Sequence, residues 1–130
     1  FECGDINVLR FRAMAYMAGR TFNDCLKKGK PLTSRQVAGL IRKLALALQE
    51  AHGADIIHRD LKPANIMIDK RKEPIVMDFG LARRDTDAEA ALTHTATMMG
   101  TPSYMAPELI RGIKDQIGAP ADIFALGVML

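Results

Sequence analysis

The sequence predicts an α+β fold, and three patterns support that prediction. A helical apolar repeat runs from Thr33 to Gly53, two short apolar runs flank a charged turn at 69–73 in the manner of a β-hairpin, and a nearly all-apolar stretch follows Pro120. The chain has no internal repeat and no low-complexity tract. We therefore expect one continuous domain, or part of one.

The composition is that of an ordinary soluble globular domain. Of 130 residues, 48% are hydrophobic and 25% are charged, which excludes disordered, collagen-like and coiled-coil classes. The net charge of +3 is small and scattered, so no nucleic-acid binding is expected. Cys3 and Cys25 lack disulfide or zinc spacing and favour a reducing, cytosolic setting. No apolar run reaches the ~18 residues that cross a bilayer.

The first third of the chain predicts a strand followed by two helices. Residues 11–17 alternate large and small side chains like a strand, and Ala18-Gly19 break the pattern. Thr21 is suited to cap a short helix to Lys28, with Gly29 after its end. The longer helix begins with a capping box, Thr33 and Gln36, and ends near Gly53. We interpret its apolar stripe as core: Val37, Leu40, Ile41, Leu44, Leu48 and Ala51.

A polar segment, 58–65, separates this helix from the predicted hairpin of 66–68 and 75–77. The 31 residues from Asp78 to Glu108 carry few periodic signals, and compact domains rarely keep such a segment unless it is functional. The stretch 121–130 predicts the opening of a buried central helix.

The chemistry-bearing residues follow the long helix. Asp60, Lys62 and Asn65 lie at i, i+2 and i+5, and Pro63 prevents their segment from continuing as helix. Pairing of the two hairpin strands would deliver Asp78 beside them. Phosphoryl transfer from a nucleotide requires metal ligands, a cation on the transferred group and a carboxylate that deprotonates the attacking hydroxyl.

These residues lie in three ordered motifs. H-R-D-L-x-x-x-N is met by 58–65, D-F-G by 78–80 and A-P-E by 106–108, so the sequence resembles the eukaryotic-like (Hanks-type) serine/threonine protein kinases, bacterial members included. The resemblance covers essentially the whole chain. It implies a partial two-lobed kinase fold, incomplete at both ends: 1–19 as the last small-lobe strands and hinge, and 20–130 as the helical lobe through the start of its central helix.

The resemblance also implies roles for the loop residues. Asp60 looks like the catalytic base, and Lys62 like the cation that neutralises the moving phosphoryl group. Asn65 and Asp78 look like the ligands of Mg²⁺ bound with ATP. Thr101 is similar to the threonine that bridges base and lysine in the serine/threonine subclass. A solvated loop charge is the alternative for each residue taken alone.

Four residues look like a nucleotide site. Met14 would be the gatekeeper behind the adenine, the backbones of Ala15 and Met17 would bind the adenine edge, and Met67 would lie under the ring. For the methionines in general, plain core filling remains the stronger alternative.

Other positions are similar to regulatory and structural residues. Arg59 would pair with a phosphate on Thr93, Thr95 or Thr97, with unmodified threonine as the equal alternative. The structural set, by resemblance, comprises His58 and Phe79 as packing residues, Glu108 as one half of a salt bridge, and Asp122, which would hold the backbone around residues 58–59. His52 and His94 carry no signal, and we expect them to be exposed.

The leading interpretation is ATP- and Mg²⁺-dependent phosphorylation of protein serine and threonine hydroxyls. A pseudokinase-type nucleotide-binding or scaffold module and an unrelated α+β domain with chance motifs are the alternatives. Residues 1–20 contain no Gly-rich loop or strand lysine. We therefore expect no phosphate transfer by this piece alone, with poor folding a risk because the helix at 121–130 would be exposed. A cytoplasmic kinase domain is expected. Membrane anchoring of the parent and dimerisation for trans-autophosphorylation are left open.

Overall fold

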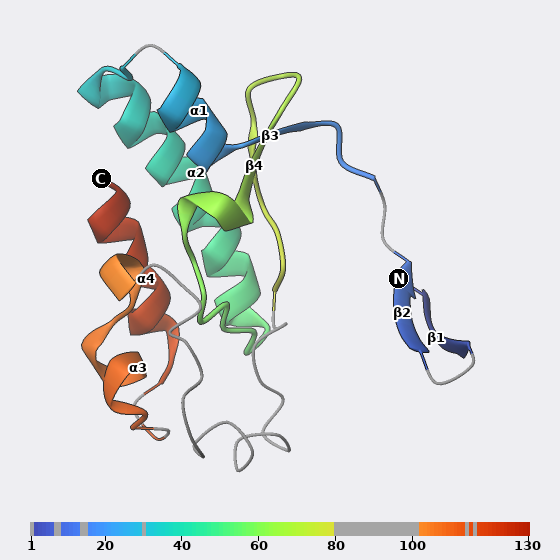
Figure 1. The fold of residues 1–130 in the computed structure, drawn as a ribbon. Helices are drawn as coiled ribbons and strands as arrows, with labels where there is room; N and C mark the ends of the chain where they lie inside the picture. Colours follow the sequence, from blue (N-terminus) through green and yellow to red (C-terminus); the bar gives the residue numbers. More distant parts are fainter. Residues whose placement is uncertain are drawn as a thin grey trace.

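The computed structural model describes residues 2–6, 9–13, 16–29, 31–79, 102–113, 115 and 117–130 (Figure 1). Several positions that the sequence singles out lie outside the described residues: Met14, Ala15, Gly80, Thr93, His94, Thr95, Thr97 and Thr101. The elements, in chain order, are β1 (Glu2–Ile6), β2 (Leu9–Ala13), β3 (Gly19–Thr21), α1 (Phe22–Lys28), α2 (Ser34–Gly53), the 3-10 turn η1 (Pro63–Asn65), β4 (Ile66–Asp69), β5 (Pro74–Val76), the 3-10 turn η2 (Pro102–Tyr104), α3 (Pro107–Arg111) and α4 (Ala119–Met129).

The first two strands form an antiparallel hairpin that stands apart from the helices (Figure 1). Glu2 pairs with Ala13 and Ile6 with Leu9. The predicted strand at 11–17 is therefore misplaced: β2 ends at Ala13, and residues 16–18 are not in a strand. Tyr16 is 92% exposed, so alternation of side-chain size there does not reflect a buried sheet face.

A second sheet has the order β3-β4-β5, with both pairs antiparallel. The β4–β5 hairpin confirms the sequence prediction, and its turn is held by Asp69, whose Oδ1 accepts the backbone N–H groups of Arg71 and Glu73 at 2.8 Å each. Because Ala18-Gly19 were interpreted as a break in the preceding strand, the sequence did not predict strand β3. Gly19 belongs to it because a Cβ atom there would lie 2.4 Å from the carbonyl oxygen of Ile68, so only glycine permits the close approach of β3 to β4.

Both N-terminal helices begin where the sequence predicts. Thr21 caps α1 by accepting the N–H of Asp24 at 3.1 Å. At α2, the Thr33 side chain accepts the Gln36 N–H while the Gln36 side chain accepts the Thr33 N–H, which completes the capping box. The apolar stripe of α2 is confirmed as core for four of its six residues, because Leu44 and Leu48 are fully buried and Leu40 and Ile41 pack against them. Val37 and Ala51 are only half-buried.

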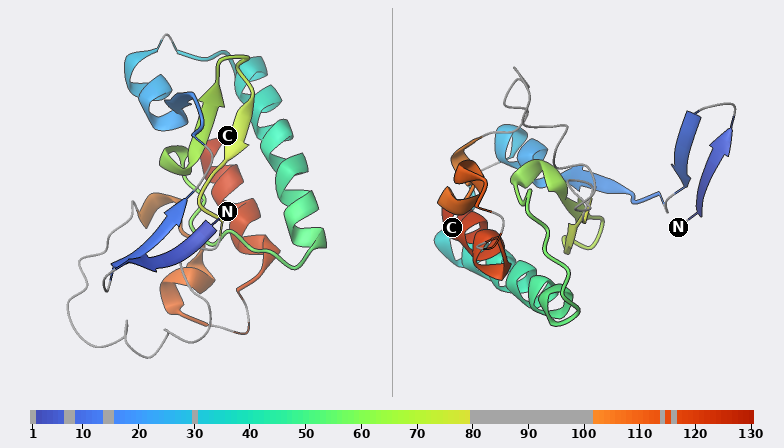
Figure 2. Two further views of the ribbon diagram at one scale, coloured as in Figure 1. Left: turned by 90° about the vertical axis from the view of Figure 1, so that its right-hand side faces the viewer. Right: turned by 90° about the horizontal axis from the view of Figure 1, so that it is seen from below.

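The core lies where α1, α2, α4 and β4 meet, and the hairpin β4–β5 lies between α1 and α2 (Figure 2). Its buried members are Phe22, Leu44, Leu48, Leu61, Ile66, Ala125 and Leu126. Leu61 belongs to the polar segment 58–65, so burial of this one leucine anchors that segment to the helices.

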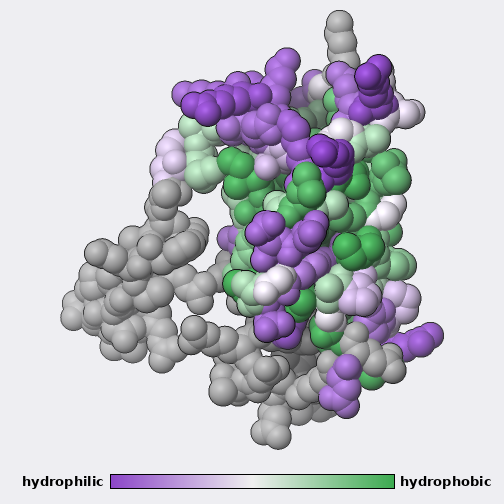
Figure 3. All heavy atoms as spheres, turned by 180° about the vertical axis from the view of Figure 1, so that it is seen from behind, coloured by the Kyte–Doolittle hydropathy of each residue, from purple (hydrophilic) through white to green (hydrophobic). Residues whose placement is uncertain are grey.

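Helix α4 forms where the sequence predicts an apolar helix, and part of it is exposed, as expected for residues 121–130 in this piece. It begins at Ala119 rather than Ala121, with Pro120 in its first turn, where a missing N–H costs no hydrogen bond. Only one face is buried: Ile123, Phe124 and Val128 are exposed, and Figure 3 shows hydrophobic residues on the surface seen from behind. Among the described residues, no helix combines the length and apolar character that crossing a membrane requires.

Candidate active site

The centre of the candidate site is the carboxylate of Asp60, in the loop between α2 and β4. Lys62 Nζ lies 2.6 Å from Asp60 Oδ2. Asn65 Nδ2 donates to the same oxygen at 3.0 Å and to the Asp60 backbone carbonyl at 2.8 Å. The fold thus brings together the three residues that the spacing i, i+2, i+5 singles out. The Asp60 side chain is 41% exposed, so this carboxylate can be reached from solvent.

The turn η1 explains why Asn65 reaches back to Asp60. Pro63 occupies its first position, and the Asn65 N–H donates to the Lys62 carbonyl at 2.9 Å. This tight turn reverses the chain over three residues, which a continuing α-helix would not do. Two hydrogen bonds from one amide group then fix the rotamer of Asn65.

Asp78 is held next to this turn by the end of β5. The Met77 N–H donates to the Asn65 carbonyl at 2.9 Å, which puts the following residue beside η1. Asp78 itself is exposed and has a φ of 60°. A non-glycine residue in this left-handed region is uncommon and often marks a functional site. The backbone of Asp78 therefore lies next to the turn that carries Asn65.

His58 joins the loop to the end of β5 from the buried side. The Asp60 N–H donates to His58 Nδ1 at 3.2 Å, so Nδ1 acts as an acceptor and carries no proton. The proton of the neutral ring is then on Nε2, which donates to the Met77 carbonyl at 2.8 Å. Phe79 packs edge-on against the ring, with centroids 5.1 Å apart. These contacts align the segments that carry Asp60 and Asp78.

Asp122, in the first turn of α4, holds the start of the loop. It is 1% exposed. Its Oδ1 accepts the Arg59 N–H and its Oδ2 accepts the His58 N–H, each at 2.9 Å. Arg59 has a φ of 68°, a strained conformation that these two bonds to a buried charge can maintain.

His52 is a site residue that the sequence reasoning missed. We expected it to be exposed, but its side chain is only 15% exposed and its Nε2 lies 2.8 Å from Asp122 Oδ2. The signal was available in the helical spacing, because His52 follows the buried residues Leu44 and Leu48 at successive i+4 positions. A polar residue at the end of a buried stripe is expected to find a partner.

The remaining predicted residues lie around this centre. Met67 is half-buried in β4, opposite Thr21 and against Gly19. Met17 is 38% exposed and precedes β3. Glu108 is half-buried in the first turn of α3. A small hollow of about 10 Å³, the size of one water molecule, lies beside Asp60 and Lys62. Its walls are Tyr104 of η2, Met105, Leu109 of α3, and Ala121 and Ala125 of α4.

The fold and the arrangement around Asp60 match one class of protein, the protein kinase domain. The family model for the protein kinase domain matches residues 9–130, and the chain belongs to that family. The expected partial kinase-type α+β fold is thereby confirmed.

Curated relatives agree with the family assignment. The chain is 43% identical over 126 residues to the serine/threonine-protein kinase pkn3 of Myxococcus xanthus, covering 92% of this chain and 23% of that protein. It is 39% identical over 122 residues to the serine/threonine-protein kinase PknB of Mycobacterium tuberculosis, covering 94% and 19%. A probable serine/threonine-protein kinase of Corynebacterium efficiens is 37% identical over 134 residues, covering 100% and 20%. The chain spans about a fifth of the length of these relatives.

Proposed function

We propose that the protein carrying this chain transfers the terminal phosphoryl group of ATP to serine and threonine hydroxyls of protein substrates. The convergence of Lys62 and Asn65 on the Asp60 carboxylate carries the proposal, together with the relatives' names. In phosphoryl transfer, positioning and charge stabilisation account for most of the catalysis.

Asp60 is proposed as the catalytic base. Its Oδ2 is engaged by Lys62 and Asn65, and no described residue donates a hydrogen bond to Oδ1. A substrate hydroxyl can therefore approach Oδ1 while the other oxygen fixes the carboxylate plane.

Lys62 is proposed to stabilise the moving phosphoryl group. Its Nζ is held 2.6 Å from Asp60 Oδ2, and its side chain is 21% exposed. An ammonium group held beside the base lies where negative charge develops as the hydroxyl attacks. Because the ion pair fixes the ammonium before substrate binds, little reorganisation is needed during transfer.

Asn65 and Asp78 are proposed to hold Mg²⁺ with ATP, and their donor chemistry fits that role. The Asn65 amide nitrogen faces Asp60, which leaves its oxygen available as a hard ligand. Among the described residues no three His, Cys, Asp or Glu side chains gather as a metal site. Mg²⁺ is usually held by one or two protein oxygens plus substrate phosphates, so this sparse set is sufficient. When bound, the ion would neutralise phosphate charge.

The test is Asp60→Asn in the full-length protein, assayed for phosphate transfer from labelled ATP to casein with Mg²⁺ present. Loss of the base should lower kcat by about 10²- to 10⁴-fold while nucleotide binding is retained. Asp55→Asn is the matched control, because Asp55 is exposed in the turn after α2 and its φ of 58° suits asparagine. Equal activity of the Asp60→Asn and wild-type proteins would refute the proposal. A wild type that binds ATP but transfers no phosphate would favour the pseudokinase alternative.

A further inference from the structure

An apolar groove lies on a part of the molecule that the proposed active site does not use. It is bordered by α1, the first half of α2 and the β4–β5 hairpin, and it encloses about 380 Å³. No residue of the loop 58–65 lines it. The volume falls in the range of ligand pockets and far exceeds the gaps left in a packed protein interior.

The floor of the groove is apolar and open to solvent. Its apolar lining comprises Phe22, Leu32, Leu40, Ile68 and Pro74. Leu32 is 40% exposed, and Leu40 is half-buried on the edge of the core. A concave apolar surface of this kind gains free energy when other apolar side chains fill it.

The elements around the groove are positively charged. Helix α1, residues 34–43 and the β4–β5 hairpin together contain eight Lys or Arg residues and three Asp or Glu residues, a net charge of +5. The whole chain has a net charge of only +3, so the positive charge is concentrated here. A field of this sign attracts acidic partners and repels basic ones.

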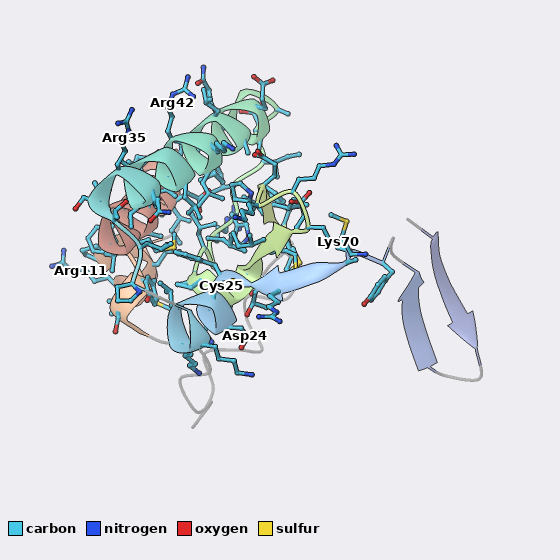
Figure 4. The ribbon with its side chains drawn as sticks, turned by 90° about the horizontal axis from the view of Figure 1, so that it is seen from above. Asp24, Cys25, Arg35, Arg42, Lys70 and Arg111 are labelled. Atoms are coloured by element: carbon cyan, nitrogen blue, oxygen red, sulfur yellow. The ribbon has the colours of Figure 1, made fainter. Side chains whose placement is uncertain are left out.

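Individual cations differ in how they contribute to this field. Lys43 is already paired with Glu73, with Nζ 2.6 Å from Oε2, and this pair ties α2 to the hairpin at the groove. Lys72 lines the groove and is exposed. Arg35 and Arg42 project from α2 into solvent (Figure 4). Cys25, on α1, lines the groove on the side of the hairpin. Lys72 is therefore placed for direct contact, whereas the arginines contribute to the positive field only at longer range, where salt screens their charge.

We propose that this groove is a docking site for a segment of a partner protein in which leucine-type side chains are flanked by aspartate or glutamate. The apolar side chains would fill the floor, and the carboxylates would face Lys72 and the surrounding positive charge. Binding of this kind involves none of the residues proposed for phosphoryl transfer, so it goes beyond the proposed function and can be measured without ATP.

Gly39 offers a way to close the groove without disturbing the fold. It lines the groove from α2, and a Cβ atom there would meet nothing within 4 Å. Gly39→Phe therefore places a ring in the open space. Gly39→Ala is the matched control, because it adds only a methyl group and is favourable in a helix by about 1 kcal/mol.

The experiment measures fluorescence anisotropy of a labelled twelve-residue peptide with two leucine pairs flanked by glutamates, titrated with the full-length protein. Two control peptides carry lysine in place of glutamate or alanine in place of leucine. We expect the acidic leucine peptide to bind at least about tenfold more tightly than either control, and more weakly at high ionic strength. Gly39→Phe should weaken binding by about tenfold or more, and Gly39→Ala should leave it unchanged.

Charge variants separate the rim from the rest of the surface. Lys72→Glu should weaken binding of the acidic peptide several-fold, while Arg111→Glu on α3, outside the groove lining, should not. Circular dichroism melting establishes that each variant is folded. Asp60→Asn should bind the peptide like the wild type, so failure of this proposal can be told from failure of the proposed function.

Three outcomes would overturn the proposal. They are saturable binding that Gly39→Phe leaves intact, equal affinity for the lysine peptide, and no binding of the acidic leucine peptide at all. A fourth outcome, a wild-type dimer that Gly39→Phe dissociates in analytical ultracentrifugation, would assign the groove to a second copy of the chain and also reject a separate partner.

Discussion

At the scale of single residues, the buried carboxylate of Asp122 determines how the candidate catalytic loop is held. A buried charge without partners would be strongly unfavourable, and Asp122 instead accepts from two backbone N–H groups and lies 2.8 Å from His52 Nε2. Hydrogen bonds to a charged group are worth about 1.5 to 3 kcal/mol each. The orientation of Asp122 is therefore over-determined, and so is the backbone that it holds.

His52 is predicted to be a positioning residue for that carboxylate. His52→Ala should remove one donor, lower the free energy of unfolding by about 1.5 kcal/mol, and reduce kcat about tenfold with the KM for ATP unchanged. His52→Gln keeps an N–H donor and should restore most of both quantities. Urea unfolding and steady-state kinetics of the full-length protein measure these effects.

Gln49→Ala provides the control for His52, because Gln49 is exposed on the same helix. It should change neither the unfolding free energy nor kcat by a measurable amount. A purely packing role for His52 would lower stability in the alanine and glutamine variants alike, and that result would contradict the positioning role.

What the sequence revealed at this scale depended on the distance between partners along the chain. Asp60, Lys62 and Asn65 lie within six positions, so their spacing and Pro63 predicted their convergence. The contact of His52 with Asp122 joins residues 70 positions apart, and no local pattern encodes it. The clue at His52 was its i+4 relation to buried leucines, which indicates burial but not the identity of the partner.

At the scale of elements, the capping box of α2 makes a separable contribution to stability. Thr33→Ala should lower the free energy of unfolding by about 1 kcal/mol, because the Gln36 N–H loses its side-chain acceptor. Thr33→Ser keeps the hydroxyl and should cost only a few tenths of that amount. Chemical denaturation of the three proteins measures the difference, and an alanine variant as stable as the serine variant would contradict the prediction.

The helices with local start signals were predictable, whereas the strand β3 was not. Thr21 and Thr33 mark the starts of α1 and α2 through contacts with residues three positions away. Gly19 indicated that the preceding strand ends, but it did not indicate that a new strand, β3, begins there. Its strand conformation depends on pairing with β4, about 50 positions away, and on a backbone approach that tertiary structure alone defines.

At the scale of the whole molecule, the site is assembled from three separate parts of the chain. Asp60 lies in the loop after α2, Asp78 follows β5, and Asp122 comes from α4. Three contacts connect them: His58 to the Met77 carbonyl, Met77 to the Asn65 carbonyl, and Asp122 to the backbone of 58–59. Disturbing any one of these elements should therefore displace the loop that carries Asp60.

The outer face of α4 leads to a prediction about the 130-residue polypeptide itself. Ile123, Phe124 and Val128 are 53%, 41% and 43% exposed, on a helix whose other face is core. Apolar surface gains about 25 cal/mol per Å² on burial, so copies of this polypeptide should associate through this face. We expect its mass in size-exclusion chromatography with light scattering to rise with concentration.

Phe124→Lys with Val128→Lys should restore a monomer, since both side chains point to solvent. Ala47→Lys with Gln49→Lys adds the same charge to the exposed face of α2 and should leave association intact. A monomeric wild-type polypeptide across the concentration range, or equal rescue by both double variants, would show that this face does not drive association.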